Sequence, residues 1–116
     1  MFGTAPPGVP ISQAIRAGCR LFVSGVLGNT SETKGDVAAQ TREILVRINR
    51  TLQEAGALPS HVVDSLVYLR DVSLFAAMDG EYRKFFGSEF PARTTIATPL
   101  VPPDALVEIM LTAVTE

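Results

Sequence analysis

The sequence predicts an α+β fold in which the elements follow the order β-β-α-β-α-β-β and two helices pack on one face of a single sheet. Three features predict it: short stretches with alternating apolar residues, two longer stretches with apolar residues at three- and four-residue steps, and glycine- or proline-rich breaks between them. The chain has 116 residues, of which 47% are hydrophobic and 19% charged. This length suits one domain, so we expect residues 1–116 to share one core.

The first half of the chain predicts a hairpin followed by a helix. The first ten residues hold three prolines and two glycines, which favours an extended lead-in. Residues 11–25, ISQAIRAGCRLFVSG, are typical of two short strands around a tight turn at Ala17-Gly18. From Asp36 the apolar period becomes helical. Asp36 suits the N-cap of this helix, and Gly56 suits the position just after its end.

The second half predicts a strand, a helix and two further strands. Residues 61–71, HVVDSLVYLRD, alternate and are rich in β-branched side chains, as strands are. We expect Ser73 to cap the second helix and Gly87 to end it. The expected inner face of that helix consists of Phe75, Met78, Tyr82, Phe85 and Phe86. Residues 92–99 and 105–114 then form two strands, joined by the segment LVPPD.

Glu108 lies in the middle of the apolar last strand. Because side chains alternate along a strand, residues 105, 107, 109, 111 and 113 form one wholly apolar face, which we expect against the helices, and Glu108 lies on the other. A buried carboxylate without a partner costs several kcal/mol. If the last two strands form a hairpin with its tip at Leu100-Val101, Arg93 lies directly across from Glu108. Arg93 is therefore the expected partner.

An Arg93–Glu108 pair has two interpretations. On a solvated face it is a cross-strand salt bridge worth about 0.5 kcal/mol, with no function. However, Leu106, Met110 and Val114 share the face of Glu108. A partly apolar sheet face on a small domain tends to become an oligomer interface, and the pair would then line a cleft between subunits.

Composition argues against several classes of protein. The formal net charge is −2 and the Lys and Arg residues are scattered, so we expect no nucleic-acid partner. No apolar run approaches the ~20 residues that span a bilayer, and the N-terminal segment lacks the pattern of a signal peptide. The single cysteine, Cys19, fits a reducing compartment. These features predict a cytoplasmic protein without a membrane partner.

Seven segments together resemble the reactive intermediate deaminase family, also called Rid or YjgF and, in older naming, L-PSP endoribonuclease. In chain order they are ISQAIRAG, LFVSG, GDVAAQTREILVRINRTLQEAG, VVDSLVYLRD, FAAMDGEYRKFF, FPART and VEI. The resemblance covers nearly the whole chain. It implies a chorismate-mutase-like fold, a homotrimer whose three clefts lie between subunits, and hydrolysis of imines or enamines of 2-oxo acids with release of ammonia.

The resemblance also implies roles for individual residues. Arg93 matches the arginine that binds the substrate carboxylate, and Glu108 matches the glutamate that places the water. Ser24 and Gly25 match a segment that lines the cleft. Thr95 matches a position whose backbone contacts the ligand.

Four positions depart from the family pattern. Ile11 replaces a common tyrosine, Val26 a glutamine, Asp79 a frequent asparagine, and Thr95 an often-seen cysteine. Because these positions line the cleft in the family, the general imine activity is expected rather than any one named substrate. Asp79 could repel an anionic substrate.

The residues themselves suit this chemistry. The planar guanidinium of Arg93 can bind a carboxylate through two parallel hydrogen bonds, and Glu108 can pass protons between an attacking water and departing ammonia. The sequence lacks a metal-ligand cluster, a Ser-His-Asp set, a Cys-His pair and a cofactor glycine motif, so we expect no metal and no cofactor. Cys19 is expected to be a small packing residue rather than a nucleophile, and His61 a surface or capping residue rather than a catalytic group.

Two other functions remain open. One is a trimeric module that binds small carboxylates or partner proteins in the same cleft without turnover. Retention of both Arg93 and Glu108 favours the enzyme, since binding needs only the arginine. The other is RNA cleavage, which the older family name suggests but an acidic chain does not favour.

Overall fold

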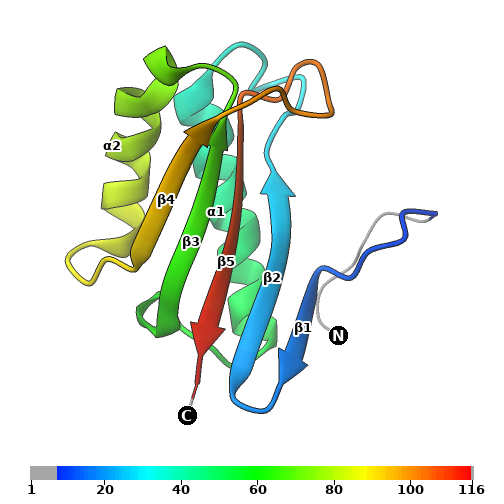
Figure 1. The fold of residues 1–116 in the computed structure, drawn as a ribbon, viewed down its shortest axis with the longest axis vertical. Coiled ribbons are helices and arrows are strands. Elements are labelled where there is room, and N and C mark those ends of the chain that lie inside the picture. The colour runs from blue at the N-terminus through cyan, green and yellow to red at the C-terminus, as the bar shows by residue number, and fades with distance from the viewer. Residues whose placement is uncertain (1–7, 116) are drawn as a thin grey trace.

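The computed structural model describes residues 8–115, which form a five-stranded sheet with two α-helices on one face (Figure 1). Most of the proline-rich lead-in lies outside the described residues. The elements in chain order are β1 Ala14–Ala17, β2 Arg20–Leu27, α1 Val37–Glu54, β3 Val62–Leu69, α2 Phe75–Phe86, β4 Ala92–Ala97 and β5 Val107–Val114, with 3-10 turns at Pro59–His61 and Val72–Leu74. The predicted order β-β-α-β-α-β-β is confirmed.

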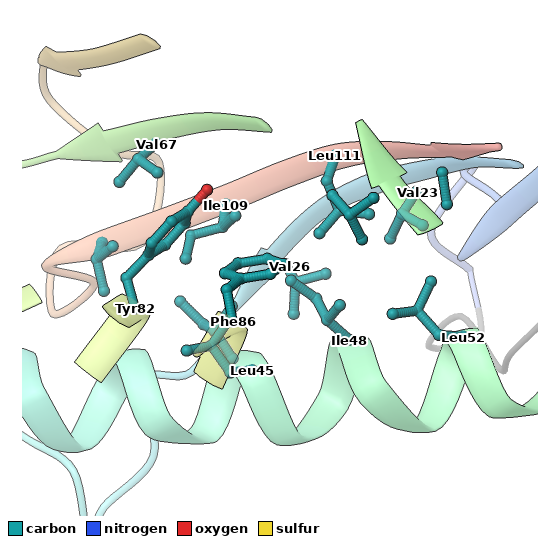
Figure 2. Packing of buried hydrophobic residues seen from close by; sticks show 14 of the residues in the cluster. Val23, Val26, Leu45, Ile48, Leu52, Val67, Tyr82, Phe86, Ile109 and Leu111 are labelled. Carbon is teal, nitrogen blue, oxygen red and sulfur yellow. The ribbon is translucent and has the colours of Figure 1, made fainter. Parts of the chain in front are cut away.

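Helix α1 forms as predicted. The carboxylate of Asp36 accepts a hydrogen bond from the backbone N–H of Ala39 at 3.1 Å, which satisfies one of the free donors at the helix start. Gly56 has a φ of 74°, a left-handed conformation that glycine adopts without strain. The apolar stripe of α1 packs against the sheet, where Ile48 and Leu52 are fully buried (Figure 2).

Helix α2 begins differently from the prediction. Its N-cap is Leu74, not Ser73, and has no side-chain hydrogen bond. Asp71 caps the 3-10 turn that precedes the helix, where it accepts from the backbone N–H of Ser73. The inner face is narrower than expected. Met78 is buried, as are Tyr82 and Phe86 (Figure 2). Phe85 is partly buried, and Phe75 is 40% exposed. Phe75 is therefore not a core residue in the chain.

The predicted hairpin between the last two strands is wrong. The sheet order is β1-β2-β5-β3-β4, so β3 lies between β4 and β5. β4 pairs parallel with β3, and β5 pairs antiparallel with both β2 and β3. The reason is that α2 connects β3 to β4. A strand-helix-strand unit returns its second strand parallel to the first, which leaves the other edge of β3 for the last strand.

The register separates Arg93 from Glu108. Arg93 is paired with Ser65, whose hydroxyl is hydrogen-bonded to Tyr82 of α2 at 2.6 Å, so Arg93 lies on the helix-covered face. Glu108 is paired with Tyr68 and Leu27, on the opposite face. The predicted alternation in β5 is confirmed, because Val107, Ile109, Leu111 and Ala113 are all buried against the helices. The predicted contact between Arg93 and Glu108 within one chain is wrong.

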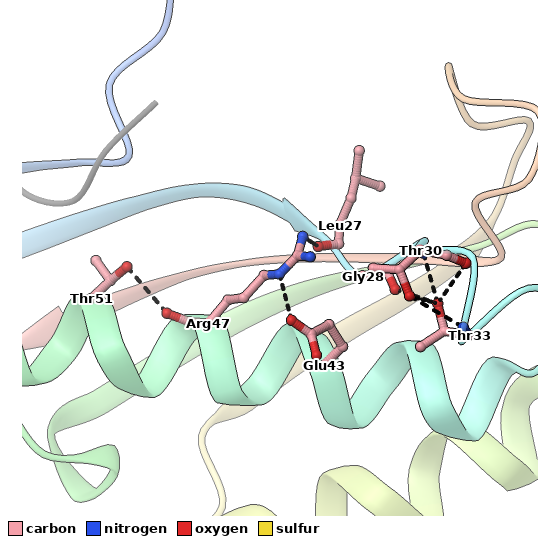
Figure 3. A network of polar contacts seen from close by, with 7 residues as sticks. All are labelled: Leu27, Gly28, Thr30, Thr33, Glu43, Arg47 and Thr51. Carbon is pink, nitrogen blue, oxygen red and sulfur yellow. Dashed lines mark hydrogen bonds and ion pairs between the residues drawn. The ribbon is translucent and has the colours of Figure 1, made fainter. Parts of the chain in front are cut away.

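The end of β2 is held against α1 by a polar network (Figure 3). The guanidinium of Arg47 donates from Nη1 to the backbone oxygen of Leu27 at 2.6 Å, and its Nε donates to Glu43 at 2.8 Å. Just after β2, the backbone at Gly28 lies close to the backbone of α1. Only glycine fits there, since a Cβ at position 28 would lie 2.4 Å from the backbone oxygen of Gln40. The hydrogen bond from Arg47 and the close packing at Gly28 together fix where β2 ends relative to α1.

Gly28→Ala is expected to destabilise the fold by about 1–3 kcal/mol, because neither backbone can move away without disturbing the helix or the strand. Chemical denaturation followed by circular dichroism measures the loss. Gly80→Ala in α2 is the matched control, since a Cβ there meets nothing within 4 Å. The control should instead be stabilised by up to about 1 kcal/mol from helix propensity. Equal stability of the two variants would contradict the contact at Gly28.

Candidate active site

The carboxylate of Glu108 has no hydrogen-bond or ion-pair partner within residues 8–115. Burial raises the pKa of Glu108 above its ordinary value. The side chain faces a pocket of about 370 Å³ on the face of the sheet opposite the helices. The lining residues are Gly25, Tyr68, Thr98, Pro99, Leu100, Val101, Glu108 and Met110. A half-buried carboxylate in a pocket is a candidate for proton transfer.

A β-bulge in β2 places Gly25 against this carboxylate. The pairing of β2 with β5 shifts between Val23 and Val26, so Ser24 and Gly25 lie where one extra residue is accommodated. A Cβ at position 25 would lie 2.3 Å from Oε2 of Glu108. Glycine is therefore required for Glu108 to adopt this position. Gly25 lines the Glu108 pocket.

Ser24 lies in the same bulge but holds the chain rather than lining this pocket. Its hydroxyl donates to the backbone oxygen of Ser12 at 2.6 Å, and its N–H donates to that of Gln13 at 3.0 Å. Ile11, which directly precedes these residues, is exposed. Ser24 thus fixes the segment that leads into β1, and Ile11 does not line the Glu108 pocket.

The wall of the pocket at residues 98–101 is held by Arg70. Its guanidinium donates to three backbone oxygens, those of Leu100 at 3.1 Å, Pro102 at 2.6 Å and Ala105 at 2.7 Å. The fully buried side chain of Gln40 fixes the next part of the loop, because its Oε1 accepts from the N–H of Leu106 at 2.8 Å. These contacts fix the loop that leads into β5, which lies between β2 and β3.

Arg93 lies on the other face, on the edge strand β4. Its Nη1 donates to Oδ1 of Asp79 at 2.7 Å, and both side chains are 23% exposed. The guanidinium carbon lies 4.7 Å from the ring centre of Tyr82 and 5.4 Å from that of Phe75, distances typical of cation–π contacts. Desolvation by burial raises the pKa of Tyr82. Arg93 is therefore held in place by one carboxylate and two aromatic rings.

A second pocket, of about 290 Å³, opens beside Arg93. Its lining residues are Asp79, Tyr82, Arg83, Phe90, Pro91 and Arg93. Thr95 lies on the same face of β4, paired with Val67, but does not line either pocket. One chain therefore separates the predicted site residues into two places: Arg93 and Asp79 at the edge of the helix-covered face, and Glu108 with Gly25 on the open face.

Tyr68 and the 98–101 loop line the Glu108 pocket, which the sequence does not reveal. Tyr68 lines the pocket because β3 is a neighbour of β5, which the hairpin interpretation excluded. Phe75 contacts Arg93 although its spacing predicts a core position. The helical connection between β3 and β4 indicates that these two strands are parallel neighbours, which leaves β5 on the other edge of β3. That order places Tyr68 beside Glu108.

The open face of the sheet exposes a row of large apolar side chains. Ile15, Phe22, Ile96 and Met110 lie on it and are 47%, 43%, 43% and 37% exposed. No helix in the described part of the chain covers this face (Figure 1). An apolar sheet face of this kind is typical of an interface between proteins.

Two further sequence predictions can be compared with the structure. His61 is structural, since its Nδ1 accepts from the backbone N–H of Leu58 at 2.9 Å. Cys19 is exposed in the turn between β1 and β2, so its expected packing role is wrong.

Within residues 8–115, no group of three or more His, Cys, Asp or Glu side chains is placed to hold a metal ion. None of the described helices is long and apolar enough to cross a membrane.

Comparison with known proteins places this arrangement in a family. Residues 2–115 match the family model described as endoribonuclease L-PSP. A RutC family protein from Pyrococcus abyssi is 39% identical, over 86% of this chain and 82% of the relative. The chain belongs to the Rid/YjgF family. Among curated Rid-family relatives, one from Acinetobacter baylyi named 3-aminoacrylate deaminase RutC is 39% identical, over 92% of this chain and 88% of the relative.

Solved structures agree with the Rid fold. A YjgF family member from Neisseria meningitidis superposes with a TM-score of 0.87 at 36% identity, covering 99% of this chain and 92% of that one. Another member, from Mycobacterium tuberculosis, has a TM-score of 0.84 at 33% identity, covering 92% and 88%. The fold predicted from the resemblance is therefore confirmed for this Rid protein.

Proposed function

We propose that the protein hydrolytically deaminates reactive imine and enamine intermediates of 2-oxo acids, of the 2-iminobutyrate and 2-aminoacrylate type, and releases ammonia. The observation that carries this proposal is the carboxylate of Glu108, which lies in a pocket without a partner in residues 8–115 and has a raised pKa. A carboxylate with a raised pKa suits proton transfer near neutral pH. The relative named 3-aminoacrylate deaminase supports the same class of reaction.

The active site in this proposal is shared between two subunits of a homotrimer. Arg93 and Glu108 lie on opposite faces of the sheet, so one chain alone does not bring them to one substrate. Arg93 is on the edge strand, where a neighbouring subunit can reach it. The exposed apolar side chains around Glu108 support an interface on the open face. The substrate would then lie between Arg93 of one subunit and Glu108 of the next.

The chemical roles follow from this arrangement. Arg93 binds the substrate carboxylate and sets the C=N carbon near Glu108. The ionised carboxylate of Glu108 accepts a proton from water as the water oxygen bonds to the imine carbon. Starting from the protonated imine, Glu108 then returns this proton to the nitrogen of the carbinolamine. It accepts the proton of the new hydroxyl as the C–N bond breaks and passes it to the ammonia, which leaves as ammonium. The carbon retains the oxygen and becomes the carbonyl of the 2-oxo acid.

An imine-decay assay tests the function. The substrates are 2-iminobutyrate and 2-aminoacrylate, generated in the cuvette by a second enzyme, with 3-aminoacrylate as a further substrate class. We expect the protein to accelerate both imine loss and ammonia release above the spontaneous rate. If the protein binds 2-oxobutyrate but leaves imine decay at the spontaneous rate, it is a small-carboxylate-binding module instead.

The activity is expected to fall at acidic pH with a midpoint above the ordinary pKa of a glutamate. Glu108 must be ionised to accept a proton from water, and burial raises its pKa, so protonation removes activity at a higher pH than for an exposed carboxyl. The measurement is kcat/KM against pH after subtraction of spontaneous hydrolysis. A midpoint at or below the ordinary glutamate value would contradict the role of Glu108.

A further inference from the structure

Asp79 uses one of the hydrogen-bond donors of the Arg93 guanidinium, the group that is proposed to bind substrate. Its Oδ1 accepts from Nη1 of Arg93 at 2.7 Å. The Nε and Nη2 groups of Arg93 have no hydrogen-bond partner within residues 8–115, so one side of the planar guanidinium stays available for a carboxylate. Any carboxylate bound there lies next to the carboxylate of Asp79.

The second carboxylate oxygen of Asp79, Oδ2, can still accept a hydrogen bond from a ligand in the pocket. This oxygen lies 3.7 Å from Nη2 of Arg83, which is longer than a hydrogen bond, and the side chain of Arg83 is 68% exposed. A carboxylate offers about four lone-pair positions, of which Arg93 uses one. Asp79 and Arg93 both line the pocket of about 290 Å³, so a small ligand there meets an anion and a cation side by side.

We infer that Asp79 makes this end of the site selective for zwitterionic ligands, in which a cationic nitrogen stands beside a carboxylate, over plain 2-oxo acid anions. The inference rests on the proposed role of Arg93 as the group that binds the substrate carboxylate. The nitrogen of a 2-iminium or 2-amino acid can donate to Asp79 while its carboxylate binds Arg93. A 2-oxo acid has no donor at that position and brings only a negative charge.

This selectivity has a consequence for turnover. The protonated imine that water attacks is a zwitterion, whereas the 2-oxo acid product carries one net negative charge. Asp79 therefore favours the substrate over the product on the same guanidinium. It promotes product release and weakens product inhibition.

Ligand binding by calorimetry at fixed ionic strength tests the inference. The probes are 2-oxobutyrate, an anion, and L-2-aminobutyrate, a stable zwitterion with the same carbon skeleton. In Asp79→Asn we expect the preference for the zwitterion, expressed as the ratio of the two dissociation constants, to fall by about tenfold. The matched control is Arg83→Gln, which removes a charge from the same pocket and should change the ratio by less than about twofold.

Each outcome bears on one part of the account. An unchanged ratio in Asp79→Asn would overturn the inference, as would an equally large opposite change in Arg83→Gln, which would mean that only the net charge of the pocket matters. Arg93→Gln should weaken both ligands. If it binds both like the wild type, the proposed role of Arg93 fails and the inference with it. If Arg93→Gln weakens both ligands but Asp79→Asn keeps the ratio, only the inference fails.

Discussion

Glu108→Gln is expected to lower kcat/KM for 2-iminobutyrate hydrolysis by a factor of about 10²–10⁴, the usual contribution of a positioned acid-base group. The amide keeps the shape of the side chain but cannot accept a proton from water. The imine-decay assay measures the loss directly. Retention of wild-type activity would contradict the proposed role of Glu108.

The stability of the same variant separates this role from simple unfolding. The pKa of Glu108 is raised in the folded state, so the ionised carboxylate opposes folding at neutral pH, and this cost disappears below the unfolded-state pKa. Glu108→Gln should therefore be as stable as the wild type at neutral pH, or more stable by less than about 1 kcal/mol, because the group is only half-buried. An activity loss accompanied by unfolding would leave no case for catalysis by Glu108.

Gly25→Ala is expected to lower kcat/KM by about 10²-fold while the fold is kept. The new Cβ would lie 2.3 Å from Oε2 of Glu108, so the carboxylate must move. The obstacle is the end of a flexible side chain rather than backbone, so its displacement costs little stability. Activity and chemical denaturation, measured on the same preparation, separate the two effects.

Two controls sharpen the experiment on Gly25. Gly80→Ala makes the same chemical change where a Cβ meets nothing within 4 Å, and it should keep wild-type activity. The double variant Gly25→Ala/Glu108→Gln should be no less active than Glu108→Gln alone, because both changes act on one group. Additive losses would mean that Gly25 acts by some route other than the placement of Glu108.

Local patterns in the sequence predict the elements well, but not which strands are neighbours. The helical period and the caps at Asp36 and Gly56 predict α1, and the alternation in β5 predicts which of its side chains are buried. The predicted hairpin between β4 and β5 is wrong because closeness along the chain does not make two strands neighbours when a helix connects β3 to β4. Parallel pairing across that helix decides the sheet order.

The site depends on contacts that a linear sequence does not display. The resemblance names Arg93, Glu108 and Gly25, and the structure places Gly25 at Glu108. Arg93 and Glu108 lie on opposite faces of the sheet because of the strand register, which no single residue encodes. The bond between Asp79 and Arg93 joins a helix to a strand, so only their packing reveals it.

We propose that each active site takes Arg93 from one subunit and Glu108 from another. Mixed assemblies of Arg93→Ala and Glu108→Gln chains test this sharing. The two variants are co-expressed with different affinity tags and purified over both tags, so that every assembly contains both kinds of chain. The mass of the assembly in solution is measured on the same material.

In the proposed cyclic trimer, an assembly that contains both variants has one interface of three that joins an intact Arg93 to an intact Glu108. We therefore expect such trimers to recover about one third of wild-type imine hydrolysis, although each variant alone is nearly inactive. Activity no higher than that of the separate variants would contradict a site shared between subunits.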